Sequence, residues 1–135
     1  QAGVKIKMIV RGICCLVPGI KGLSENITVI SVVDKFLEHP RVLIFENAGD
    51  KKIYLSSADF MTRNIENRVE VACPVYDDEL QRQILDTFEL SWKDNIKARV
   101  VNQNPQNKMV IAQSDQASQR SQWTTYAYFK NKLKP

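Results

Sequence analysis

Three observations in the sequence predict a mixed α/β domain. First, β-branched and apolar runs indicate strands. Second, the acidic residues Asp77-Asp78-Glu79 precede Leu80, Ile84 and Phe88, which recur every fourth residue as on one face of a helix. Third, an aromatic segment near the C-terminus has the composition of a second helix. Strands interleaved with helices are typical of a mixed β-sheet flanked by helices.

Each element follows from a local pattern. The expected strands cover residues 4–10, 27–33, 42–45, 53–55, 69–75 and 97–101, and the expected helices begin at residue 77 and near residue 123. A Pro/Gly loop over 18–23 separates the first two strands. Residues 34–38 suggest a helix turn before Pro40, and the turn 47–52 joins two strands into a hairpin. The Leu80 row, extended by Trp92, is expected to face the core.

Length and cysteine content limit the classes of protein to which this chain can belong. A chain of 135 residues can bury one core without disulfides, so we expect a single domain over residues 1–135. No apolar run reaches the roughly 20 residues that span a bilayer. The three cysteines are an odd number and two are adjacent, which favours a reduced, cytoplasmic compartment. The start at Gln1 suggests a piece of a longer protein.

Positive charge is concentrated in the C-terminal segment. Residues 96–135 carry seven Lys/Arg and one acidic residue, a balance of +6, whereas residues 1–95 have a balance of −2. The aromatic residues of this segment are spaced like one helix face, so we do not expect a nucleic-acid partner. One alternative stays open: a non-catalytic module that binds polyanions through this basic segment.

Common catalytic motifs are absent from the sequence. It has no Gly-rich phosphate loop of the P-loop or dinucleotide type and no G-x-S-x-G nucleophile turn. With one histidine, His39, and no C-x-x-C pair, a conventional zinc site is unlikely to form, so we expect no metal site within the chain. The remaining candidate chemistry surrounds His39.

The sequence from His39 resembles the half-site of the phospholipase D superfamily, H-x-K-x4-D followed by G-S-x-N. Arg41 stands at the lysine position, Glu46 at the aspartate position, and Ser56-Ser57-Ala58-Asp59 at G-S-x-N. A histidine just before a buried strand can attack or protonate a phosphoryl group, and an arginine two residues on can neutralise phosphate oxygens. Arg41 could equally pair with Glu38 or Glu46.

A longer segment resembles the C-terminal catalytic domain of bacterial polyphosphate kinases, a family similar to phospholipase D in fold. The resemblance rests on residues 10–27, on Phe36-Leu37-Glu38-His39, on Gly49-Asp50, on Ser56-Ser57-Ala58-Asp59 and on Arg63-Asn64, and it covers roughly residues 4–101. It implies a phospholipase D-like fold. It also implies reversible transfer of the terminal phosphate of ATP to inorganic polyphosphate, with Mg²⁺ held mainly by the rest of the enzyme.

The resemblance also assigns roles to individual residues. His39 matches a second active-site histidine, Arg11 a nucleotide-phosphate ligand and Arg68 a basic residue of the phosphate tunnel, while Arg41 joins them as a phosphate ligand. The phosphorylated histidine of the family belongs to a preceding domain, so we expect this chain to be inactive alone.

The expected partners are ATP or ADP, inorganic polyphosphate and the preceding domains of the same polypeptide. The parent enzyme is expected to be a cytoplasmic homo-oligomer that can associate with membranes. A rival enzyme interpretation is a phosphodiesterase or nuclease that completes its site by dimerisation.

Overall fold

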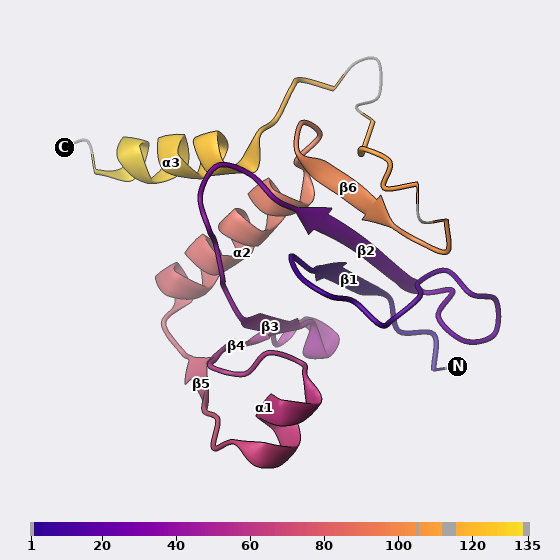
Figure 1. Cartoon of the computed structure of the whole chain (residues 1–135). Coiled ribbons are helices and arrows are strands. Elements are labelled where there is room, and N and C mark those ends of the chain that lie inside the picture. The colour runs from indigo at the N-terminus through magenta and orange to yellow at the C-terminus, as the bar shows by residue number, and fades with distance from the viewer. Residues whose placement is uncertain (1, 105, 112–115, 134–135) are drawn as a thin grey trace. The chain divides into compact units, whose positions relative to one another are not determined.

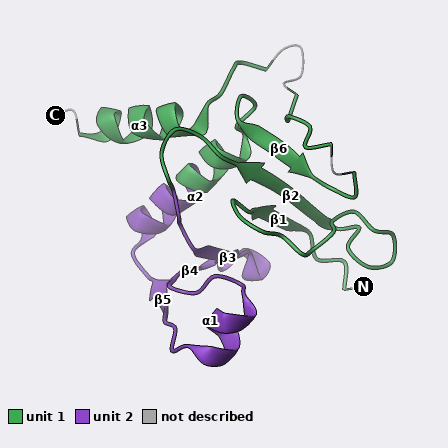
Figure 2. Ribbon diagram, in the orientation of Figure 1, with its two compact units in different colours: residues 1–37, 87–135 green, residues 38–86 purple. Residues whose placement is uncertain are grey.

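The structure, a computed structural model, describes residues 2–104, 106–111 and 116–133. Figure 1 shows the order of the elements along the chain. The chain divides into two compact units, residues 1–37 with 87–135 and residues 38–86, which are coloured separately in Figure 2. The elements are β1 (Ile6–Ile9), β2 (Ile27–Val32), β3 (Val42–Phe45), a 3₁₀ turn (Asn47–Gly49), β4 (Lys52–Ser56), α1 (Thr62–Asn67), β5 (Ala72–Val75), α2 (Asp78–Trp92), β6 (Ala98–Val101) and α3 (Ser121–Lys132). The expectation of a single domain stays a prediction.

The first unit contains a three-stranded sheet with the order β1-β2-β6. Strand β2 runs parallel to β1 and antiparallel to β6, so it is the central strand. Its Val29 and Ile30 are 1% and 5% exposed, and Ala98 of β6 is fully buried. Consecutive buried residues are typical of a strand covered on both faces, which explains why β2 consists mainly of β-branched residues.

A buried carboxylate organises the connection from α2 to β6. Asp94 is fully buried, and one of its oxygens accepts backbone N–H groups of Ile96, Lys97 and Ala98 at 2.9, 2.6 and 3.1 Å. The other oxygen accepts the Ser121 N–H at 2.7 Å, at the start of α3. Burial alone raises the pKa of Asp94, but these backbone donors outweigh it and keep the pKa below its ordinary value.

The expectation of a helix turn over residues 34–38 is wrong, because side chains at the start of α3 bind this segment. The Asp34 carboxylate accepts two bonds from the Arg120 guanidinium, at 2.7 and 2.6 Å. The Gln122 amide bonds both the N–H and the C=O of Phe36, at 3.1 and 2.8 Å. Because these groups are engaged by the distant segment, they are not available for a helical turn.

The second unit contains the antiparallel sheet β3-β4-β5. The expected hairpin is confirmed as β3 and β4, with Val42 opposite Leu55 and Phe45 opposite Lys52. Its central strand β4 places Ile53, 1% exposed, at the middle of the sheet. The strand expected over 69–75 is shorter, because regular pairing begins only at Ala72.

The helices differ from the expectation in two places. Helix α1 was not predicted, since its six residues carry no capping side chain and no acidic residue in the first turn. Helix α2 forms as expected, and Phe88 and Trp92 stack at 6.2 Å, but Leu80 is 52% exposed and so does not face a core. Among the described residues, no helix combines the length and apolar character needed to cross a membrane.

We predict that Asp94→Asn destabilises the chain by about 3 kcal/mol, because an amide nitrogen replaces one acceptor of buried N–H groups and leaves a donor without a partner. Chemical denaturation followed by circular dichroism measures this change. Asp50→Asn is the matched control: Asp50 is 73% exposed beside Lys52, and its loss should change the free energy of unfolding by about 0.5 kcal/mol or less. Equal effects of the two substitutions would contradict the role given to Asp94.

Candidate active site

His39 and Arg41 lie just before β3 in the second unit. Pro40 favours extended backbone at the residue before it, and side chains two residues apart in an extended segment point to the same side. The Arg41 carbonyl accepts the Ser56 N–H at 2.8 Å, which ties the start of β3 to the end of β4. The two side chains therefore stand beside the segment that leaves β4.

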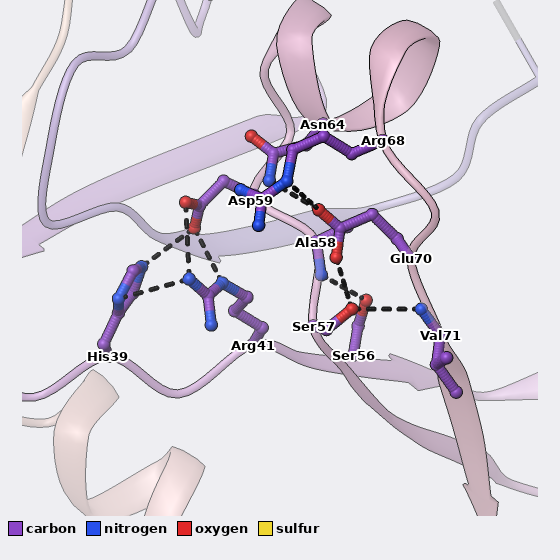
Figure 3. Close-up of polar contacts among 10 residues, drawn as sticks. All are labelled: His39, Arg41, Ser56, Ser57, Ala58, Asp59, Asn64, Arg68, Glu70 and Val71. Carbon is purple, nitrogen blue, oxygen red and sulfur yellow. Dashed lines mark hydrogen bonds and ion pairs between the residues drawn. The ribbon is translucent and has the colours of Figure 1, made fainter.

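Asp59 completes a three-residue cluster, hereafter the His39 triad (His39, Arg41, Asp59; Figure 3). A turn returns the chain after β4, with the Ala58 N–H bonded to Ser56 Oγ at 3.0 Å. Asp59 Oδ1 then lies 2.8 Å from both His39 Nε2 and Arg41 Nε, and Oδ2 lies 3.4 Å from Arg41 Nη2. Arg41 Nη2 also lies 3.3 Å from His39 Nδ1. The side chains of His39, Arg41 and Asp59 are 44%, 29% and 27% exposed, so the triad is open to a ligand.

The hydrogen bonds define the protonation of the triad. A guanidinium only donates, so His39 Nδ1 accepts from Arg41, and His39 Nε2 carries the proton that it donates to Asp59. The Arg41 guanidinium, followed by His39, lowers the pKa of Asp59 to about 2, and Asp59 in turn raises the pKa of Arg41. The triad thus pairs the Arg41 cation with the Asp59 anion, and the His39 ring is hydrogen-bonded to both.

A second cluster, hereafter the Glu70 cluster (Ser57, Asn64, Arg68, Glu70), fixes the same turn from the other side (Figure 3). The Glu70 carboxylate accepts the Ser57 hydroxyl and, at 2.8 Å, the Asn64 amide, and it lies 3.6 Å from Arg68 Nε. These hydrogen bonds, led by the one from Ser57, lower the pKa of Glu70. Ser57 donates its one hydroxyl proton to Glu70, so it has no proton left for a phosphate, and its Oγ accepts the Val71 N–H at 3.0 Å.

The structure brings some of the sequence-predicted residues together. His39 and Arg41, which their spacing predicted to point to the same side, both bind the Asp59 carboxylate. Arg68 lies in the same unit, on Glu70, with its side chain 59% exposed. Arg11 belongs to the first unit, where it follows β1 and is exposed. The assignment of these four residues to phosphate binding stays a prediction.

The carboxylate beside His39 is not the one that spacing indicated. Glu46, at the aspartate position of the motif, is 69% exposed and pairs with Lys51 at 2.9 Å. Asp59 takes that place instead, from the position of the motif's asparagine. The only signal for Asp59 in the sequence was its membership of the Ser56–Asp59 segment, and no motif pointed to Glu70.

The described residues do not fit a magnesium site. Mg²⁺ takes oxygen ligands, usually carboxylates and water. The Asp59 and Glu70 carboxylates are occupied by cationic or hydrogen-bonding side chains. Across the described residues, no three His, Cys, Asp or Glu side chains are grouped so that they could hold a metal ion. These carboxylates are therefore not assigned a role in binding Mg²⁺.

The mixed α/β fold and a histidine–arginine pair ahead of strand β3 define a protein of the phospholipase D-like class. The family model described as "Polyphosphate kinase C-terminal domain 2" matches residues 1–122. The chain therefore belongs to the polyphosphate kinase C-terminal domain family, which confirms the family and fold class predicted from its sequence.

Individual relatives agree with this assignment. The polyphosphate kinase of Vibrio parahaemolyticus is 52% identical over 97% of this chain and 19% of its own length, and that of Escherichia coli K12 is 46% identical over 100% and 20%. The crystal structure of polyphosphate kinase from Porphyromonas gingivalis superposes with a TM-score of 0.91 at 46% identity, covering 96% of this chain and 20% of that one. The chain thus spans about a fifth of the length of these relatives.

We predict that Asp59 stays ionised until the pH falls to about 2. Because its pKa lies below the ordinary 3.8, the triad stabilises the folded chain fully at pH values well above 3.8 and loses this contribution as the pH falls through about 2. Carboxyl ¹³C NMR measures the titration. Arg41→Gln should move the pKa of Asp59 back toward 3.8, and His39→Ala should move it less. Titration of Asp59 near 3.8 in the unsubstituted chain would contradict the geometry.

Proposed function

We propose that this chain is the supporting half of a polyphosphate kinase active site. In this proposal the His39 triad contacts the phosphates of ATP, ADP or inorganic polyphosphate, and Arg11 and Arg68 add positive charge. The reaction is reversible transfer of the terminal phosphate of ATP to polyphosphate. The observation that carries the proposal is the triad itself, a guanidinium and an imidazole held side by side on one carboxylate.

The chemistry of phosphoryl transfer suits this arrangement. The transition state is loose, so catalysis depends on positioning and on stabilising charge at the phosphate oxygens. Asp59 engages Arg41 Nε and Nη2, and in Figure 3 the remaining terminal nitrogen, Nη1, points away from Asp59. That nitrogen can donate to a phosphate oxygen without disturbing the triad. His39 can exchange its bond to Asp59 for one to a phosphate.

The rest of the reaction belongs to the remainder of the enzyme in this proposal. The phosphorylated histidine and most ligands of Mg²⁺ lie in preceding domains of the same polypeptide, and the full-length enzyme is a cytoplasmic homo-oligomer. The lack of fit between Mg²⁺ and the described carboxylates is consistent with this division. The isolated chain should then bind phosphate chains without turning them over.

We predict that polyphosphate binds the isolated chain at the triad. His39 is the only histidine, so its ring ¹⁵N resonances are identified without ambiguity and should shift on titration with polyphosphate. Arg41→Ala should weaken binding about ten-fold, because it removes a charge-assisted donor. Lys130→Gln with Lys132→Gln, in the basic C-terminal segment, is the control and should weaken it far less.

The opposite pattern would support the alternative of a polyanion module. Binding that leaves the His39 resonances unchanged and is lost in the lysine variant would overturn the triad as the binding site. Synthesis of polyphosphate from ATP, or cleavage of a phosphodiester, by the pure chain would contradict its role as a supporting half.

A further inference from the structure

The triad contains an anion where a phosphate-binding site benefits from cations. The Asp59 carboxylate occupies the Nε and Nη2 edge of Arg41, which is one of the two edges that could hold a phosphate bidentately. Asp59 also accepts the hydrogen bond that His39 Nε2 donates. With a pKa of about 2, Asp59 keeps its charge at neutral pH and cancels that of Arg41. For phosphate affinity alone, Asp59 is unfavourable.

What Asp59 provides is orientation. His39 lies outside regular secondary structure, its side chain is 44% exposed, and it forms hydrogen bonds with Asp59 and Arg41. Arg41 likewise has several rotatable bonds and is fixed at its guanidinium by the same carboxylate. A carboxylate shared at 2.8 Å by both donors sets the ring plane, its tautomer and the direction of Arg41 Nη1 together.

We propose that Asp59 is a positioning residue for phosphoryl transfer, which orients His39 and Arg41 toward the phosphates and lowers the affinity of the site for them. This inference rests on the proposed function. It assigns Asp59 a role opposite in sign to that of the cations: Asp59 supports turnover while it weakens binding.

The carboxamide substitution separates the two effects. Asp59→Asn keeps the shape of the side chain and removes the negative charge. If its oxygen keeps the place of Oδ1, it still accepts from His39 Nε2 and Arg41 Nε, but its NH₂ group then faces Arg41 Nη2, another donor, and displaces the guanidinium. In a full-length polyphosphate kinase that contains this chain, we expect kcat to fall about 30-fold, within the range for misplaced catalytic groups. We expect the KM for polyphosphate to fall about three-fold or more, because the site gains one unit of positive charge.

Two further variants isolate charge from geometry. Asp59→Glu keeps the charge on a longer arm, so kcat should fall without the decrease in KM. Asp50→Asn makes the same chemical change at the opposite end of β4, where Asp50 pairs with Lys52 at 2.7 Å. It should leave kcat and KM within about two-fold of the unsubstituted enzyme, as expected for an exposed ion pair.

NMR of the isolated chain provides a direct readout of position. The ring ¹⁵N resonances of His39 should report a proton on Nε2, protected from exchange by Asp59. In Asp59→Asn this protection should decrease while the melting temperature stays close to that of Asp50→Asn. A melting temperature that falls together with kcat, and with a higher KM, would show a structural role and overturn the proposal.

The outcomes also separate this inference from the proposed function. If His39→Ala and Arg41→Ala leave kcat and KM unchanged in the full-length enzyme, the proposed function fails. If those variants impair turnover but Asp59→Asn leaves kcat unchanged, the proposed function stands and the positioning role of Asp59 is wrong. A lower kcat together with a lower KM in Asp59→Asn is the result that supports both.

Discussion

The Glu70 carboxylate fixes the turn on which the candidate site depends. It binds the Ser57 hydroxyl and the Asn64 amide, and Ser57 in turn accepts the Val71 N–H. These bonds connect the chain leaving β4 to the chain entering β5, and the same turn delivers Asp59 to His39. Glu70 is only 15% exposed, and its removal would leave the amide of the buried Asn64 without this partner, at a cost of about 1–3 kcal/mol.

In both units, buried or partly buried carboxylates stabilise connecting segments that contribute few buried apolar side chains. The buried hydrophobic side chains Val29, Ile30, Ile53 and Ala98 all lie in strands. The connections between elements are fixed by polar groups instead: Asp94 gathers backbone N–H groups before β6, and Glu70 does so with side chains after β4. Polar bonds are directional, so they specify loop geometry more sharply than apolar contacts do.

The sequence allowed prediction of features that depend on near neighbours. The β3–β4 hairpin follows from two apolar runs and a turn, and the shared side of His39 and Arg41 follows from their spacing around Pro40. The sequence pattern did not predict that Asp59, and not Glu46, lies beside His39, because this depends on the path of the turn after β4. The helix turn at 34–38 failed for a related reason: Gln122, 86 residues from Phe36, takes its backbone groups.

The hydrogen bonds of the His39 triad and the Glu70 cluster join residues that are closer in sequence than Asp34 and Arg120 of the first unit. In the triad, His39 and Asp59 are 20 residues apart, whereas Asp34 and Arg120 of the first unit are 86 apart. Contacts between near neighbours form early, since the loop they close costs little entropy. During synthesis the candidate site can therefore assemble before α3 exists, and the first unit is completed only when the last helix arrives.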